Sequence, residues 1–298
     1  MNLVLFEPQE LGQVSRAGDV PTGADASVRA DASVRADAPA GADASARADA
    51  PAGWTRVEGY ELTLRDRRAA HLLTVVRVVP GSRVRVGVLG GGLGYAEVVA
   101  VDREGCVLRV HIERPPPPPL PVHLILAVPR PKVLLRTVAI AASFGVERID
   151  LTNSWRVDKS YLGSPALSAE ALGRAAREGA EQGATSRLPV LGVHRRLMSL
   201  LDAFPEKERA GGRLCAIAHP GAARTLESAV APGERRPLTL AVGPEGGWIA
   251  REVETFEQRG FTQVALGEAI LRVEAAIAAL LGQVQLLRRL RPYERDEP

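Results

Sequence analysis

The sequence Val242-Gly243-Pro244-Glu245-Gly246-Gly247-Trp248 and the later sequence Leu266-Gly267-Glu268-Ala269-Ile270-Leu271-Arg272 share one plan. Each follows or overlaps the end of a short apolar run of strand length, and its glycines keep side-chain bulk away from the backbone. A helical pattern begins at Leu271. Because open α/β sheets bind ligands at loops that leave the carboxyl ends of strands, we expect both stretches to contribute to one ligand site.

The composition is that of a globular protein with room for two domains. The chain has 298 residues, of which 46% are hydrophobic. No apolar run approaches the length of a membrane span and the N-terminus lacks the pattern of a signal peptide, so we expect a cytoplasmic protein. The two cysteines, Cys106 and Cys215, are too few for a disulfide framework or a thiolate metal site, so we expect free thiols and no metal.

Arginines are concentrated between residues 54 and 85. This segment has seven arginines and three acidic residues, although the net charge of the whole chain is only +3. Such a local excess is compatible with a phosphate-binding face. On charge alone, an ordinary solvated surface is the better explanation, because the whole chain uses arginine almost to the exclusion of lysine.

Residues 18–53 differ in composition from the rest of the chain. The unit Ala-Ser-Val-Arg-Ala-Asp occurs at residues 26–31 and 32–37, and in altered form at residues 44–49. Six residues do not make a whole number of helical turns, so the few valines cannot share one helix face. We predict a disordered surface insertion. A marginal Ala-rich helix is the alternative, which Pro39 and Pro51 oppose.

The remainder of residues 1–114 predicts a small β-rich domain. Strand-like segments lie at residues 3–6, 83–89, 94–100 and 106–113, and turn residues follow the later ones. Short strands at this spacing suggest a barrel. The prolines of residues 115–119 lie in a stiff linker at residues 115–120, which we expect to separate this domain from the next.

Residues 121–298 predict a second domain in which strands and helices alternate. Strands are expected at residues 122–128, 146–151, near Val190, and at 214–218, 238–242 and 262–266; helices are expected at residues 133–144, 168–182, 251–258 and 271–290. This order predicts a mostly parallel sheet covered on both faces. Glu245 is a candidate cap for the helix at residues 251–258, and Glu274 lies in a first helical turn, where the dipole favours an acid.

Both glycine-bearing stretches resemble the motifs of one known family. AVGPEGGW at residues 241–248 and ALGEAILRVEAA at residues 265–276 are similar to the cofactor loops of SPOUT-superfamily methyltransferases, and specifically of the RsmE family. HLLTVVRVVPGSRVRVGVLGGGLG at residues 71–94 resembles that family's N-terminal PUA-like barrel. PRPK, VDKSYLGSP and AHP, which begin at Pro129, Val157 and Ala218, resemble blocks of its catalytic domain.

The resemblance implies a fold and a reaction. It implies a PUA-like RNA-binding β-barrel followed by a SPOUT α/β domain with a deep trefoil knot. The domain would bind S-adenosylmethionine in a bent conformation and methylate N3 of a uridine in 16S ribosomal RNA. The resemblance also implies a homodimer whose two subunits share each site, with ribosomal RNA or a small-subunit particle as partner. The strand and helix pattern alone predicts an ordinary doubly wound sheet, because chains rarely thread their own loops.

Candidate site residues follow from the same resemblance. The expected cofactor-binding residues are Ala218, His219, Val242, Gly243, Pro244, Glu245, Gly246, Gly247, Leu266, Gly267, Ile270, Leu271 and Arg272. Arg187 or Arg272 would stabilise negative charge on the uracil oxygens, and Glu274 would accept a proton or support the site. The expected RNA-binding residues are Arg67, Arg68, His71, Arg77, Lys132 and Lys159. Purely structural or surface roles stay open for His71, His219 and both lysines.

The sequence is compatible with three functions. The first is an RNA uridine methyltransferase that acts on a splayed-out base. The second is an RNA-binding module with a degenerate catalytic half, and the third is an α/β protein whose GPEGG loop holds a phosphate at a helix start. Departures from the family pattern occur at Ile140, residues 143–145, residues 183–186 and Ala275, and none of them is an expected cofactor-binding residue. They leave a different RNA substrate as an alternative.

Overall fold

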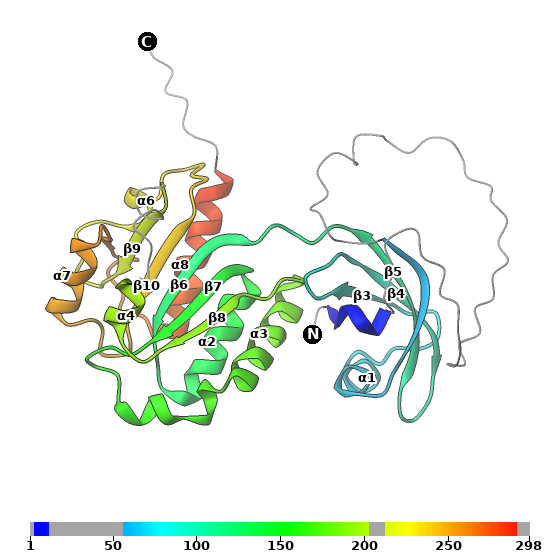
Figure 1. Cartoon of the computed structure of the whole chain (residues 1–298). Helices are drawn as coiled ribbons and strands as arrows, with labels where there is room; N and C mark the ends of the chain where they lie inside the picture. Colours follow the sequence, from blue (N-terminus) through cyan, green and yellow to red (C-terminus); the bar gives the residue numbers. More distant parts are fainter. Residues whose placement is uncertain (1–2, 12–55, 203–211, 291–298) are drawn as a thin grey trace, which may run out of the picture.

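The computed structural model describes residues 3–11, 56–202 and 212–290, which form two β-sheets with separate hydrophobic cores (Figure 1). The predicted insertion at residues 18–53 lies outside the described residues. An extended segment after β5 leads from the first sheet to β6 of the second, and it contains the predicted proline linker.

The N-terminal sheet has five strands in the order β1-β3-β4-β5-β2. The strands are β1 (Val4–Phe6), β3 (Arg83–Val88), β4 (Leu93–Val101), β5 (Cys106–Arg114) and β2 (Val57–Leu64). β1 pairs with β3 in parallel, and the other pairs are antiparallel. No pairing joins β1 to β2 in the described part of the chain, so this sheet is open at both edges. It fits an N-terminal half-barrel.

One face of the N-terminal sheet carries a hydrophobic core. Alternate residues of β5, namely Leu108, Val110 and Ile112, are fully buried there, as the period of two in a strand requires. The face is covered by the short 3-10 helix η1 (Pro8–Leu11), by α1 (Arg67–His71) and by the π-helical turn η3 (Leu72–Val76).

The C-terminal sheet has six parallel strands in the order β11-β9-β10-β6-β7-β8. They are β6 (Leu120–Ala127), β7 (Val146–Thr152), β8 (Val190–His194), β9 (Leu214–Ala218), β10 (Leu238–Val242) and β11 (Thr262–Val264). The predicted parallel sheet is therefore confirmed. β10 is buried at all five positions, as expected for a central strand that is covered on both faces.

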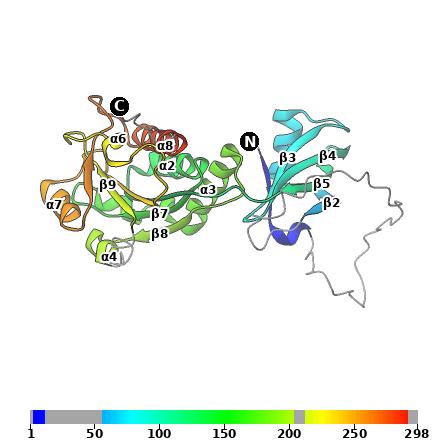
Figure 2. The same ribbon diagram turned by 90° about the horizontal axis from the view of Figure 1, so that it is seen from above.

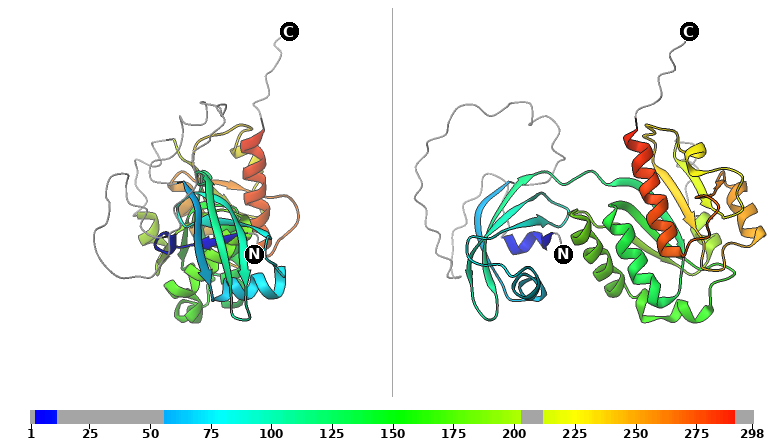
Figure 3. Two further views of the ribbon diagram at one scale, coloured as in Figure 1. Left: turned by 90° about the vertical axis from the view of Figure 1, so that its right-hand side faces the viewer. Right: turned by 180° about the vertical axis from the view of Figure 1, so that it is seen from behind.

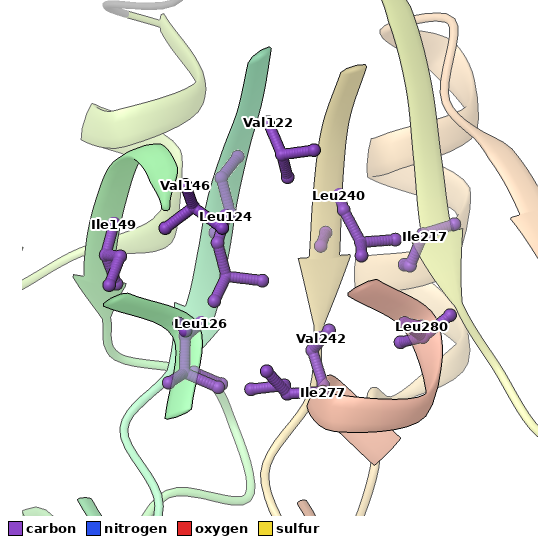
Figure 4. Close-up of a cluster of buried hydrophobic side chains, with 14 of the residues drawn as sticks. Val122, Leu124, Leu126, Val146, Ile149, Ile217, Leu240, Val242, Ile277 and Leu280 are labelled. Carbon is purple, nitrogen blue, oxygen red and sulfur yellow. The ribbon is translucent and has the colours of Figure 1, made fainter. Parts of the chain in front are cut away.

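Helices cover both faces of the C-terminal sheet (Figure 2). One layer contains α2 (Pro131–Ser143), α3 (Ala169–Gly183), α6 (Leu226–Ala229) and α8 (Val273–Arg289), and the other contains α4 (Leu197–Asp202) and α7 (Ala250–Gln258). Figure 4 shows Leu126 of β6, Val242 of β10 and Ile277 of α8 within the buried cluster that joins the sheet to the first layer.

The two sheets are joined through α3, whose C-terminal half lies beside β1 (Figures 1 and 3). Leu3, Leu5 and Ala180 form a small buried cluster at this junction. The Arg177 guanidinium donates to the Leu5 carbonyl at 2.8 Å, and Arg67 donates to the buried carboxylate of Glu181. The N-terminal sheet is therefore held to the C-terminal sheet by apolar and charged contacts as well as by the linker.

The described residues contain neither a candidate membrane span nor a candidate metal site. None of their helices combines the length and the apolar character needed to span a bilayer. Across residues 3–11, 56–202 and 212–290, no three His, Cys, Asp or Glu side chains are grouped in a way that could hold a metal ion.

Candidate functional site

Three strand ends lie in one row and bring the two glycine-bearing loops together. In the register of the C-terminal sheet, Ala218 at the end of β9 pairs with Val242 at the end of β10 and with Val264 at the end of β11. The chain leaves all three strands at the same edge because the strands are parallel. Loops that are distant in the sequence therefore surround a common space.

This space is a cavity of about 580 Å³. Its lining includes every residue that the sequence analysis assigned to cofactor binding: Ala218, His219, Val242, Gly243, Pro244, Glu245, Gly246, Gly247, Leu266, Gly267, Ile270, Leu271 and Arg272. Arg156, Pro220, Trp248, Val264, Ala269, Val273 and Ala276 complete the lining. The structure thus places the predicted residues together, and their binding role stays a prediction.

The loop after β10 is a tight turn that depends on glycine. The Gly247 N–H donates to the Pro244 carbonyl at 2.8 Å, and Gly247 has a φ of +72°, which favours glycine. A Cβ atom on Gly243 would lie 3.2 Å from both the backbone nitrogen and the indole nitrogen of Trp248. The turn therefore needs small residues at both positions to keep its backbone close to the cavity.

Two sets of polar groups in the cavity wall lack protein partners within the described chain. The indole N–H of Trp248 is buried and makes no hydrogen bond. The backbone of residues 266–271 makes no hydrogen bond to the described part of the chain. The residues of this loop are mostly exposed, so their free backbone donors and acceptors suit a ligand with several hydrogen-bonding atoms.

Glu245 does not cap the helix at residues 251–258, which corrects the sequence-based expectation. That helix, α7, is capped by Glu252, whose carboxylate accepts from the Ile249 N–H at 3.1 Å. Glu245 instead accepts from the Arg130 N–H at 3.0 Å, at the start of α2. The turn geometry points the Glu245 carboxylate across the sheet edge toward the loop after β6.

Arg156 is a cavity residue that the sequence analysis did not identify. It follows β7, lines the cavity, and donates a hydrogen bond from Nη1 to the Gly246 carbonyl. A Cβ atom on Gly246 would lie 3.1 Å from the Arg156 side chain, so the glycine also makes room for this contact. The position of Arg156 just after a predicted strand could have suggested a site residue. Its hydrogen-bond partner Gly246 lies 90 residues later in the chain, so no local pattern relates the two.

The predicted catalytic residues lie at different distances from the cavity. Arg272 lines it directly. Glu274 lies in the first turn of α8 and is not part of the lining. Arg187 donates from Nε to the Pro117 carbonyl at 2.8 Å in the linker, so the structure ties its side chain to the junction between the sheets. None of these placements tests a catalytic role.

Not all of the predicted RNA-binding residues lie at the surface. Arg68 is buried, and its guanidinium contacts the carboxylates of Glu10 and Asp66 and the Leu5 carbonyl. Burial by itself lowers the pKa of Arg68, but hydrogen bonds to Glu10 and Asp66 outweigh this effect and raise the pKa above its ordinary value. Arg68 therefore carries a structural role in the N-terminal core.

Arg67 is half-exposed and paired with Glu181, and His71 lines a separate groove beside β3 with Arg83 and Arg85. Arg77 is exposed, with a left-handed backbone (φ +59°) at the end of η3. Lys132 and Lys159 are exposed, and the structure shows no ion pair for either within the described residues. These two lysines stay available for a phosphate.

A buried charged cluster lies in the C-terminal sheet, outside the cavity lining. The Asp150 carboxylate accepts from Arg148 and is hydrogen-bonded to His123 at 2.7 Å and to His194 at 2.9 Å. Burial by itself raises the pKa of Asp150, but these hydrogen bonds outweigh it and hold the pKa well below its ordinary value. A Cβ atom on Gly192 would overlap Asp150, so this glycine leaves room for the carboxylate.

Comparisons with known proteins agree on one family. Residues 116–285 match the family model described as "RNA methyltransferase domain". A protein from Treponema pallidum named "Ribosomal RNA small subunit methyltransferase E" is 27% identical over 245 residues, which are 80% of this chain and 91% of that protein. A Mycobacterium bovis protein of the same name is 28% identical over 222 residues, which are 73% and 83% of the two chains.

Solved structures show the same fold. The structure of "Ribosomal RNA small subunit methyltransferase E" from Neisseria gonorrhoeae bound to S-adenosyl methionine has a TM-score of 0.61 at 23% identity, and covers 78% of this chain and 93% of that chain. The structure of a probable rRNA-methyltransferase from Porphyromonas gingivalis has a TM-score of 0.58 at 23% identity, and covers 76% of this chain and 93% of that chain.

Proposed function

The chain belongs to the RNA methyltransferase domain family, and from this premise we propose that it transfers a methyl group from S-adenosylmethionine to N3 of a uridine in 16S ribosomal RNA. The observation that carries the proposal is the convergence of the two glycine-bearing loops on one cavity. Relatives named as small-subunit ribosomal RNA methyltransferases, over 91% and 83% of their own lengths, support the substrate.

The cavity fits S-adenosylmethionine by size and by chemistry. A volume of about 580 Å³ lies within the range of small-molecule sites. The mostly exposed backbone of residues 266–271 offers hydrogen bonds to the polar atoms of the cofactor. When bound, the cofactor supplies a methyl group that its sulfonium already activates. The glycines of both loops allow the backbone to approach a flat adenine.

The protein's own residues then have three tasks. The cavity walls orient the donor and exclude water, which accounts for much of the catalysis of a transfer between two bound molecules. Arg272, in the lining, stabilises the negative charge that spreads to the uracil oxygens as the N3 proton leaves. Glu274, in the first turn of α8, is the candidate acceptor for that proton or a support for Arg272.

The proposal extends to the architecture. Residues 1–114 serve as a PUA-like RNA-binding domain, residues 115–120 as a linker, and residues 121–298 as a SPOUT domain with a trefoil knot. The half-barrel sheet and the shared fold of the solved methyltransferases support this division. The protein acts on ribosomal RNA or a small-subunit particle in the cytoplasm.

A homodimer is part of the proposal. Ile270 is 84% exposed at the cavity and Leu271 is 41% exposed, and α8 exposes Leu286 as well. Large apolar side chains at a ligand site favour a protein surface that covers them. A second copy of this chain would enclose the cavity and exclude water from the reacting atoms.

Two measurements test the function. Calorimetry with S-adenosylhomocysteine is expected to give micromolar or tighter binding, whereas inorganic phosphate is expected to give none. Incubation with undermethylated small subunits and labelled donor is expected to yield 3-methyluridine at one position, identified by mass spectrometry. Binding of phosphate alone would support the anion-binding hypothesis, and tight donor binding without transfer would support a degenerate enzyme.

A further inference from the structure

The most exposed aromatic side chain of the described chain lies next to the cavity. Trp155 is 80% exposed, and it precedes Arg156, which lines the cavity. Tryptophan is rarely so exposed, because its side chain offers a large area to bury. Within residues 3–11, 56–202 and 212–290, nothing covers most of the Trp155 side chain.

The loop that carries Trp155 is held in place on both sides. Ser154 and Val157, its neighbours in the loop, are each 6% exposed. The backbone N–H of Trp155 donates to Glu252 Oε1 at 2.8 Å, and Glu252 also caps α7. The loop therefore presents the indole to solvent from a fixed backbone, and the exposure is a feature of the fold.

Basic residues lie on the neighbouring loops at this edge of the sheet. Arg156 is exposed and bound to the Gly246 carbonyl. Arg130 is exposed and is placed at the same loop by the hydrogen bond from its N–H to Glu245, and Lys132 follows it at the start of α2. An aromatic face with nearby cations is the combination that binds unpaired nucleic acid through stacking and phosphate contacts.

The reaction itself requires an unpaired base. N3 of uracil lies on the Watson–Crick edge, so it is accessible only when the uridine is out of its pair and out of its stack. Leaving the stack is unfavourable unless another flat surface replaces the lost contact. A fixed, exposed indole beside the donor cavity can provide that surface.

We infer that Trp155 is a positioning residue on which an unpaired base of the substrate RNA stacks at the entrance of the cavity. The inference rests on the proposed RNA methyltransferase function. The stacked base is the target uracil or its neighbour in the strand, and the nearby cations hold the phosphates that flank it. The indole acts through the RNA and makes no contact with the donor.

The test compares Trp155→Ala, Trp155→Phe and the control Met198→Ala, which removes another exposed apolar side chain, on α4. Trp155→Ala is expected to raise KM for undermethylated small subunits about tenfold or more, with kcat little changed. Trp155→Phe, which keeps a stacking face, is expected to recover most of the loss. Met198→Ala is expected to match the wild type. All variants are expected to bind S-adenosylhomocysteine equally.

A fluorescence titration with a uridine-rich single-stranded oligonucleotide gives a second readout. The chain has three tryptophans, so the titration is made in a Trp54→Phe background. There, the protein that keeps Trp155 is expected to show quenching that the further change Trp155→Phe removes, because the remaining Trp248 is buried. An unchanged KM in Trp155→Ala would overturn the inference, as would a shift of that variant to a smaller species in light scattering, which would assign Trp155 to a subunit contact. Absence of S-adenosylhomocysteine binding in the wild type would instead refute the proposed function, while quenching could still be measured.

Discussion

Glu245 Oε1 accepts a hydrogen bond from the backbone N–H of Arg130 at 3.0 Å, although the two residues are 115 positions apart. α2 begins directly afterwards at Pro131 and has no side-chain cap of its own. The carboxylate of the cavity loop therefore satisfies a donor at the start of α2 and places a negative charge at the positive end of its dipole. One residue of the GPEGG motif thus connects the proposed cofactor loop to the loop after β6.

Removal of this carboxylate is expected to destabilise the fold. Glu245→Ala should lower the free energy of unfolding by about 1 kcal/mol, as loss of a helix N-cap does. Glu245→Gln, which keeps the acceptor oxygen, should lose less. Glu254→Ala, which alters an exposed glutamate of α7, serves as the control. Chemical denaturation measures all three, and equal stability of Glu245→Ala and Glu254→Ala would contradict the capping role.

Two glycines of α3 provide a matched pair for the packing of α2 against α3. A Cβ atom on Gly179 would lie 2.0 Å from the Ala139 carbonyl oxygen, whereas a Cβ atom on Gly173 would meet nothing within 4 Å. Gly179→Ala should therefore lower the unfolding free energy by about 2 kcal/mol or more. Gly173→Ala should raise it by about 0.5–1 kcal/mol, because alanine favours a helix. Thermal unfolding of both variants measures these changes. A change of the same sign in the unfolding free energy of both variants would refute this packing.

Two other glycines separate backbone strain from ligand binding. Gly247 in the cavity wall and Gly260 after α7 have φ values of +72° and +81°, and added Cβ atoms would meet nothing within 4 Å at either position. Replacement of either glycine by alanine should lower the free energy of unfolding by about 1 kcal/mol. Only Gly247→Ala should also weaken S-adenosylhomocysteine binding, by about tenfold, in calorimetry. A similar loss of binding in Gly260→Ala would show that strain alone is responsible.

The lowered pKa of Asp150 predicts how the stability of the protein depends on pH. Its pKa is lowered in the folded state, so its stabilisation is fully present above the unfolded pKa of about 3.9 and is lost as the pH falls below that value. Asp150→Asn should lose about 3 kcal/mol at pH 7, because His123, Arg148 and His194 lose a buried carboxylate.

The same variant should show a weaker loss of stability between about pH 4 and pH 2 than the wild type. Urea denaturation across this pH range measures the difference. Parallel curves for the two proteins would mean that Asp150 does not control the acid sensitivity.

The exposed side chains of Lys132 and Lys159 are expected to contact phosphate. Lys132→Ala and Lys159→Ala should each weaken binding of single-stranded RNA and reduce the slope of log K against log salt by about 0.7. Arg174→Ala is the control, because Arg174 is exposed but paired with Glu170 on α3. Filter binding at several salt concentrations gives the slopes. A slope that stays at the wild-type value would remove that lysine from the RNA path.

Much of the C-terminal domain could be predicted from local patterns. The alternation of apolar runs and helical spacings places β6, β7, β9 and β10 within two residues of their observed ends. β2 was missed because Glu58, Gly59 and Glu61 interrupt its apolar residues, and its partner β5 lies far along the chain. α1 was missed because its five residues are too few for a helical period to be visible.

The sequence by itself determined the approximate positions of β6, β7, β9 and β10 and the glycines of the cavity loops, because apolar periodicity and glycine content act over a few neighbours. The strand expected at residues 262–266 ends earlier, at Val264. Only the tertiary structure decided that Arg68 is buried with Glu10, that Arg156 reaches Gly246, and that Glu245 caps α2. These pairs join residues 58, 90 and 115 positions apart. Their contacts depend on the order of strands in the sheets, which brings together side chains that no local pattern relates.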